Sequence, residues 1–171
     1  RPCDLAEVAG NAAAEAAPLM GDRELRVENE HPLWFDGNPD ELHRMVLNLL
    51  DNAAKWSPPG GRVGVRLTQI DPLHAELVVS DRGPGIPPQE RRLVFERFFR
   101  STSARAMPGS GLGLAIVKQI VVKHGGTLSV EDTVPGGQPP GTSVHVVLPG
   151  RPIPATRPTG VAEPVVSADN A

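Results

Sequence analysis

The feature that most constrains this sequence is a strongly marked helix that begins near residue 38. Asn38 can cap the helix, Pro39 suits its first position, and Glu41 stands three residues after the cap. The apolar residues that follow share one face, at the spacing with which a helix meets a sheet: Leu42, Met45, Val46, Leu49, Leu50 and Ala53. We therefore predict a helix from Pro39 to about Trp56, ended by the proline and glycine run at 58–61.

The other elements alternate between helices and short strands. Helices are expected over 4–17, around 89–97 and over 112–123, the last with apolar residues at 112, 116 and 120. Strands are expected at 25–27, 33–35, 63–67, 77–80, 127–130 and 142–148. This order predicts an α+β fold, a two-layer sandwich with a mixed, mostly antiparallel sheet packed on about three helices.

Length and composition favour one globular domain. Residues 1–150 are expected to form it, and the Pro- and Ala-rich segment 151–171 to be a disordered tail. A net charge of -3 argues against a nucleic-acid binder, and the single cysteine, Cys3, allows no internal disulfide. No apolar run is long enough to span a bilayer, so we expect no direct membrane contact by this domain.

The polar residues Asn48, Asn52 and Lys55 lie at i, i+4 and i+7, on one edge of the predicted helix. Two amide oxygens and an ammonium group in a row suit a hydrated Mg²⁺ and the phosphates that it bridges. A polar stripe that only faces solvent is the alternative.

A second candidate site element, Asp81-Arg82-Gly83-Pro84-Gly85, directly follows a short apolar strand. A buried carboxylate at Asp81 could accept a hydrogen bond from an exocyclic amine such as that of adenine. Gly83 and Gly85 would permit close backbone approach, and Ile86 could supply an apolar wall. An ordinary Asp-Gly turn is the alternative.

A third element, Gly109-Ser110-Gly111-Leu112-Gly113, opens a predicted helix whose free N–H groups favour a phosphate. It matches neither the dinucleotide fingerprint nor a P-loop, and the sequence lacks the motifs of the protein-kinase fold. Between the second and third elements, Arg97, Arg100 and Arg105 could neutralise charge on a transferring phosphoryl group. A surface helix docked by its phenylalanines is the alternative.

Together these segments resemble the N, G1, F and G2 boxes of sensor histidine kinases. The resemblance rests on Asn48–Ser57, Asp81–Gly85, Phe95–Arg100 and Gly109–Leu114, in the family's order, and Gly141-Thr142 resembles its terminal glycine motif. It spans roughly residues 4 to 149. Where the family more often has Tyr or Phe, this chain has Trp56, which keeps an aromatic face.

The resemblance implies a Bergerat-type fold in which ATP lies between the Asn48–Ser57 helix and a flexible lid. Asn52 would be the main Mg²⁺ ligand with Asn48 beside it, Lys55 would reach the phosphates, and Asp81 would hold the adenine amino group. Arg100 is the first choice for the γ-phosphate, before Arg97 and Arg105. The remaining nucleotide contacts implied are Trp56, Gly83, Gly85, Ile86, Gly109, Ser110, Gly111, Leu112, Gly113 and Thr142.

None of the five histidines, His31, His43, His74, His124 and His145, has the context of a phosphoacceptor. The expected partners are therefore a dimerisation and phosphoacceptor domain missing from this chain and, through the full-length kinase, a response regulator. The resemblance implies a cytoplasmic domain of a membrane-anchored sensor kinase, homodimeric in full length and monomeric as this piece.

Two other classes stay open at this point. One is an anti-sigma-type serine kinase or another ATPase of the same superfamily, against which the Phe95–Arg100 segment argues. The other is a non-catalytic nucleotide-binding pseudokinase, against which the intact Asn52, Asp81, Gly111 and Gly113 argue.

Overall fold

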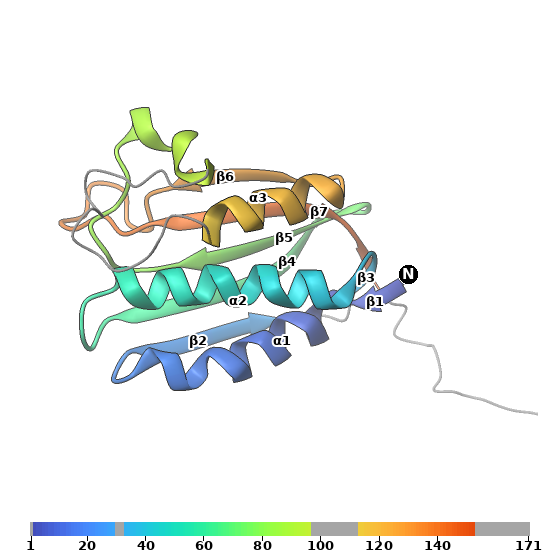
Figure 1. Ribbon diagram of the computed structural model, residues 1–171, viewed down its shortest axis with the longest axis horizontal. Coiled ribbons are helices and arrows are strands. Elements are labelled where there is room, and N and C mark those ends of the chain that lie inside the picture. The colour runs from blue at the N-terminus through green and yellow to red at the C-terminus, as the bar shows by residue number, and fades with distance from the viewer. Residues whose placement is uncertain (1, 30–32, 97–112, 153–171) are drawn as a thin grey trace, which may run out of the picture.

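A five-stranded sheet covered on one face by three helices forms the body of the protein (Figure 1). The computed structural model describes residues 2–29, 33–96 and 113–152. The helices are α1 (Leu5–Ala16), α2 (Pro39–Trp56) and α3 (Gly113–Lys123), with 3-10 turns η1 (Ala17–Met20), η2 (Pro88–Glu90) and η3 (Leu93–Phe95). The strands are β1 (Pro2–Asp4), β2 (Glu24–Asn29), β3 (Leu33–Asp36), β4 (Arg62–Asp71), β5 (His74–Ser80), β6 (Thr127–Glu131), β7 (Ser143–Pro149) and β8 (Arg151–Pro152).

The main sheet has the strand order β2-β4-β5-β7-β6. Strands β2 and β4 pair in parallel, and the other three pairs are antiparallel. The predicted two-layer α+β fold with a mixed, mostly antiparallel sheet is therefore confirmed. Strands β1, β3 and β8 form a separate small sheet at one end of the molecule.

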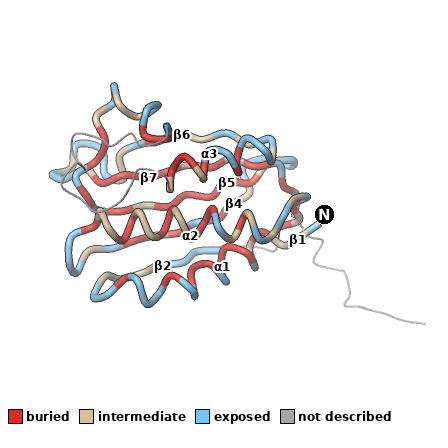
Figure 2. Tube along the Cα trace, viewed as in Figure 1, coloured by how far each residue is buried: buried red, intermediate tan, exposed pale blue. Residues whose placement is uncertain are grey.

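Helix α2 lies in the middle of the helical layer, between α1 and α3 (Figure 1). Its cap is as predicted, because Asn38 Oδ1 accepts hydrogen bonds from the N–H groups of Asp40 (2.9 Å) and Glu41 (3.2 Å). All six residues of its predicted apolar face are buried, and Figure 2 shows the buried positions recurring along the helix. The helix therefore presents one face to the sheet and leaves a polar edge elsewhere.

Several sequence-based expectations were wrong in detail. Where a helix was expected around 89–97, the described residues up to 96 form the short turns η2 and η3 instead. Among these residues only Val94 and Phe95 are buried, and the preceding ones form no apolar stripe. In α3 the residues most deeply buried are Val117 and Val121, whereas Ile116 is only half-buried. Ile120 of the predicted repeat is buried, and Lys118, Gln119 and Lys123 lie on the exposed side, so the spacing identified the packed face only in part.

The small sheet also departs from expectation. The strand predicted at 33–35 exists as β3, but it pairs with β1 and β8, for which no strand was predicted. Strand β8 carries the folded part past the boundary expected at residue 150, and residues 153–171 lie outside the described residues. Within the described part, no helix combines the length and the apolar character needed to cross a membrane.

The connection between β6 and β7 packs closely against the loop that follows β5. Gly141 has a φ of +71°, its N–H donates to the carbonyl oxygen of Gly83 (3.0 Å), and a Cβ at this position would overlap the carbonyl oxygen of Asp81. Gly136, in the same connection, has a φ of +78° but open space around it. The two glycines thus share a left-handed backbone conformation, but only at Gly141 do neighbouring atoms leave no space for a side chain.

We expect Gly141→Ala to lower the free energy of unfolding by about 1–3 kcal/mol more than Gly136→Ala does. Both variants strain the backbone, but only the methyl group at position 141 overlaps neighbouring atoms. Urea unfolding of both variants measures the difference. Equal losses would show that the close approach at Gly141 does not constrain the fold.

Candidate functional site

The ends of β5 and β7 bring Asp81 and Thr142 together. Ser80, the last residue of β5, is the register partner of Ser143, the first residue of β7. Asp81 and Thr142 are therefore neighbours although 61 residues separate them in sequence. Two residues that the sequence nominated independently meet at this edge of the sheet, next to the last turns of α2.

Asp81 is the buried acceptor of the site, with 4% of its surface exposed. Its Oδ1 accepts hydrogen bonds from the N–H groups of Gly83 (2.8 Å) and Thr142 (3.0 Å), and its own N–H donates to the carbonyl oxygen of Thr142 (2.8 Å). Neither side-chain bond uses Oδ2. The carboxylate is thus fixed in orientation by backbone groups while one oxygen stays available to an N–H donor.

Burial raises the pKa of Asp81 to about 6, although the hydrogen bonds from Gly83 and Thr142 act in the opposite direction. The desolvation that disfavours the charged form is the larger effect. At neutral pH the group is still a carboxylate, and its surroundings make an incoming hydrogen bond stronger than it would be in water.

Two glycines shape the surface beside Asp81. A Cβ on Gly83 would lie 2.6 Å from the carbonyl oxygen of Trp56, and one on Gly85, whose φ is +83°, would lie 2.7 Å from Cγ of Pro140. Neither position accepts a side chain without movement. Ile86, which follows directly, is 4% exposed and belongs to the hydrophobic core.

The polar edge of α2 carries Asn48, Asn52 and Lys55, all half-buried. Lys55 Nζ forms an ion pair with Asp51 Oδ2 (3.0 Å) within the helix. The amide nitrogen of Asn48 is buried and has no hydrogen-bond partner among the described residues, and the same holds for the hydroxyl of Thr142. A buried polar group without a partner is costly, so both atoms are sites where a bound molecule could restore a hydrogen bond.

These residues suit a cation held together with phosphates rather than a cage made by the protein alone. Among the described residues, no group of three or more His, Cys, Asp or Glu side chains is arranged to hold a metal ion. Mg²⁺ typically takes one or two protein oxygens and completes its shell with water and phosphate oxygens. The amide oxygens of Asn48 and Asn52 fit that requirement.

Other residues that the sequence nominated fall partly outside the described chain. Arg97, Arg100, Arg105, Gly109, Ser110, Gly111 and Leu112 lie in the segment 97–112, which is not described. Gly113 is the first residue of α3, and a Cβ there would meet nothing within 4 Å. Trp56 lines a hollow of about 420 Å³ with Lys55 and Gly83 at the end of α2.

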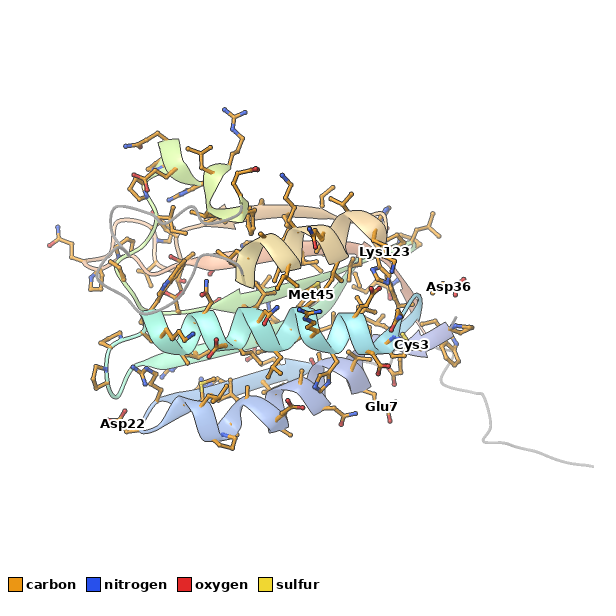
Figure 3. All side chains as sticks on the ribbon, in the orientation of Figure 1. Cys3, Glu7, Asp22, Asp36, Met45 and Lys123 are labelled. Atoms are coloured by element: carbon orange, nitrogen blue, oxygen red, sulfur yellow. The ribbon has the colours of Figure 1, made fainter. Side chains whose placement is uncertain are left out.

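The sequence did not predict that Ser57 links the end of α2 to two other segments of the chain. This residue is 2% exposed, its Oγ accepts from the N–H of Arg82 (3.0 Å), and its carbonyl oxygen accepts from Arg23 Nε (2.9 Å). Nearby, Asp22, labelled in Figure 3, accepts from the N–H of Gly60 (3.0 Å). The end of α2 is thus tied to the loop after β5. A small polar residue directly before two prolines was the only signal for it.

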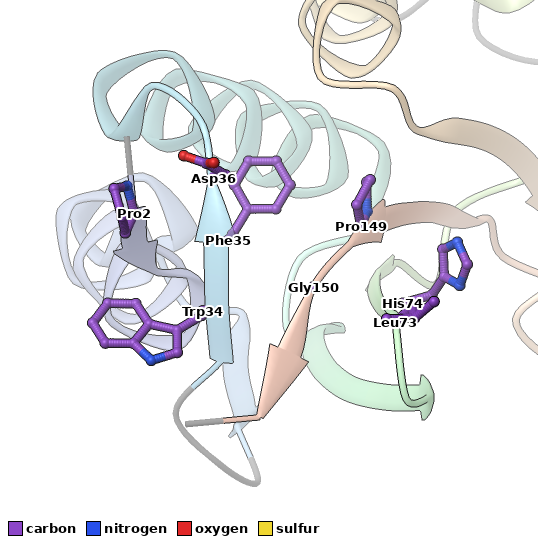
Figure 4. Close-up of a pocket in the computed structure, with 8 residues that line it drawn as sticks. All are labelled: Pro2, Trp34, Phe35, Asp36, Leu73, His74, Pro149 and Gly150. Atoms are coloured by element: carbon purple, nitrogen blue, oxygen red, sulfur yellow. The ribbon is translucent and has the colours of Figure 1, made fainter. Parts of the chain in front are cut away.

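A second hollow, of about 410 Å³, is shown in Figure 4, and it lies beside the small sheet at the other end of the molecule (Figure 1). Its lining comes from the small sheet and from the turn between β4 and β5, and includes Trp34, Phe35, Leu73 and His74. None of the nominated site residues borders it. The convergence of buried polar groups therefore makes the Asp81 end the candidate functional site.

The chain is similar to known proteins in both sequence and structure. The family model described as histidine kinase-, DNA gyrase B-, and HSP90-like ATPase matches residues 37–152. A similar curated protein is the signal transduction histidine-protein kinase/phosphatase MprB of Mycolicibacterium vanbaalenii, 85% identical over 160 residues. That match covers 86% of this chain and 33% of the relative, so the chain spans about a third of the relative's length.

Two solved structures are also similar. The mycobacterial sensor histidine kinase MprB has a TM-score of 0.85 and 63% identity, covering 90% of this chain and 100% of that one. The ATP binding domain of PrrB from Mycobacterium tuberculosis has a TM-score of 0.68 and 30% identity, covering 87% and 96%.

The burial of Asp81 leads to a test of stability against pH. Its pKa rises from 3.8 to about 6 on folding, so the contribution of this group to stability is fully present below pH 3.8 and is lost as the pH rises through about 6. Asp81→Asn removes the buried charge and keeps an oxygen for the two N–H donors. We expect the variant to be more stable than the parent chain at pH 7, by about 1–3 kcal/mol.

Urea unfolding at pH 4 and pH 7 measures this effect, and the advantage of the variant should be smaller at pH 4. A variant that is less stable than the parent chain at pH 7 would show that hydrogen bonding to the charged form outweighs its desolvation.

Proposed function

Because the chain belongs to the histidine kinase-, DNA gyrase B- and HSP90-like ATPase family and is a histidine kinase ATP-binding domain, we propose that it binds Mg-ATP and donates the γ-phosphoryl group to a histidine on another domain. The observation that carries this proposal is the buried carboxylate of Asp81, which two backbone N–H groups fix on one oxygen. Kinase activity is proposed for the full-length protein, of which this chain supplies the nucleotide site.

At the base end of the nucleotide, Asp81 accepts a hydrogen bond from the adenine amino group. Guanine presents an oxygen at the equivalent position, so a carboxylate there favours adenine. The hydroxyl of Thr142, buried without a partner in the described chain, lies on the residue whose N–H holds Asp81 and is available to the same ligand. Gly83, Gly85 and Ile86 provide the close-fitting surface beside the base, and Trp56 an aromatic face.

At the phosphate end, Asn52 and Asn48 hold Mg²⁺ or contact phosphate oxygens, and Lys55 reaches the phosphates. The unpartnered amide nitrogen of Asn48 supports this role, since it can donate to a phosphate, and a flipped amide would offer its oxygen to a cation instead. Lys55 exchanges its partner Asp51 for phosphate when the nucleotide is bound. Mg²⁺, when bound, neutralises charge on the phosphates.

The segment 97–112 completes the site in this proposal. Arg100, and after it Arg97 and Arg105, neutralises the γ-phosphoryl group during transfer, and Gly109, Ser110, Gly111 and Leu112 supply backbone N–H groups to the phosphates with Gly113. Catalysis by this domain is then mainly positioning and charge neutralisation of a loose transition state.

The phosphoacceptor lies elsewhere in the full-length kinase. The four described histidines are each engaged: His43 with Glu15, His74 with Asp71, His124 with the carbonyl oxygen of Ile120, and His145 with Glu76. None of the histidines has the sequence context of a phosphoacceptor, so a separate dimerisation and phosphoacceptor domain is the first partner and a response regulator the second. The full-length protein is proposed to be a membrane-anchored homodimer with this domain in the cytoplasm.

The site assignment is tested by Asn52→Asp and Asp81→Asn. We expect each variant to weaken Mg-ATP binding by at least about a hundredfold, or 2.7 kcal/mol. Asn52→Asp places a negative charge against the phosphates, and Asp81→Asn replaces a carboxylate oxygen that accepts a hydrogen bond with an amide group that donates one. Isothermal titration calorimetry measures the affinity. Gln119→Glu, the same change of amide to carboxylate at an exposed position of α3, is the control and should bind as the parent chain does. Unchanged affinity in both site variants would refute the assignment.

Phosphoryl transfer is tested with γ-labelled Mg-ATP. The isolated chain should bind the nucleotide but form no acid-labile phosphohistidine, because none of its five histidines has the sequence context of a phosphoacceptor. Stable phosphohistidine on the isolated chain would contradict the proposal of a separate acceptor domain.

A further inference from the structure

Arg91 lies outside the motifs of the nucleotide site, yet its side chain joins two segments that border it. Its Nε donates a hydrogen bond to the carbonyl oxygen of Ile86 (3.0 Å), and its Nη2 donates to Oδ1 of Asp132 (2.7 Å). The side chains of Arg91 and Asp132 are only 25% and 31% exposed. A short, charge-assisted bond in a partly shielded place is stronger than an ordinary surface ion pair.

The segment from Asp81 to Ile86 is held along its length by the connection that follows β6. Asp81 bonds to Thr142, Gly83 accepts from the N–H of Gly141, and Gly85 packs against Pro140. Asp132 is the first residue of the same connection, directly after β6. The hydrogen bonds of Arg91 to Ile86 and Asp132 therefore form a further link between the two segments, at the end where Ile86 lies.

An arginine suits this position because two acceptors on different segments must be satisfied at once. The guanidinium group presents its N–H donors in a rigid fork, whereas the lysine ammonium is a compact charge on a flexible stem. Without Arg91, the carbonyl oxygen of Ile86 loses its side-chain partner, and the backbone there can relax. The nearly complete burial of Ile86 makes its position sensitive to such a shift.

We propose that Arg91 is a positioning residue for nucleotide binding, which acts through Asp132 and the Ile86 carbonyl to fix Ile86 as the apolar wall against the base. This inference rests on the nucleotide site proposed above. It assigns to Arg91 a role at the base end of the ligand and none at the phosphates.

The test compares Arg91→Gln, Arg91→Lys and Asp132→Ala with Arg92→Gln, a neighbouring exposed arginine that loses the same charge. Affinities for AMP, ADP and Mg-ATP are measured by calorimetry at 10 °C, on protein whose folding is checked by circular dichroism. We expect Arg91→Gln and Asp132→Ala to weaken all three nucleotides by the same factor, about tenfold, because all three share the base. Arg91→Lys should also bind more weakly, and Arg92→Gln should stay within about twofold of the parent chain.

Two results would overturn the role of Arg91. Affinities within about twofold of the parent chain in folded Arg91→Gln and Asp132→Ala would make the ion pair merely structural. A loss that grows with the number of phosphates and recurs in Arg92→Gln would make it a general effect of charge. If the parent chain binds none of the three nucleotides, the nucleotide site itself is refuted, which is a separate result.

Discussion

The packing of α2 across the sheet is the interaction on which both the fold and the site depend. Its buried Leu, Met and Val side chains each stabilise the fold by about 1.5–3 kcal/mol when fully removed from water, and the buried apolar residues come from one face only. Because that face is fixed against the sheet, the rotation of the helix about its axis is fixed as well. Asn48, Asn52 and Lys55 must then project from one edge, beside the ends of β5 and β7. The core therefore determines where the polar groups of the site can point.

The second constraint is the burial of Asp81, which acts against stability. A carboxylate whose pKa is raised by burial costs free energy at neutral pH, and the protein lowers that cost with two backbone N–H groups rather than with a cation. A cation would stabilise the charge but would compete with a ligand for the carboxylate oxygens. Because both backbone donors bind Oδ1 of Asp81, Oδ2 can still accept a strong hydrogen bond from a ligand. The arrangement favours binding over stability, as is common at functional sites.

Sequence alone predicted the parts of the structure that depend on local patterns. The cap at Asn38, the apolar face of α2 and the polar edge beside that face follow from spacing. The glycines around Asp81 follow from the need for close approach. The face on which α3 packs followed only in part, because the predicted repeat contained the buried Ile120 and the half-buried Ile116 but not the fully buried Val117 and Val121. The pairing of β3 with β1 and β8 depends on contacts between segments far apart in sequence. The hydrogen bonds of Ser57 and Arg91 join segments far apart in sequence, and the spacing of apolar residues does not predict such contacts.

The connection between β6 and β7 explains why so much of the site rests on backbone groups. Thr142 and Gly141 hold the Asp81 loop through main-chain hydrogen bonds, while Asp132 reaches the same loop through Arg91. Main-chain donors keep their chemistry whatever side chain they carry, so substitutions change this part of the site mainly by shifting the backbone. The glycines and Arg91 fix that backbone by two different means, one by allowing close approach and the other by linking two segments. A site built in this way depends on the geometry of a loop as much as on the few side chains that touch the ligand.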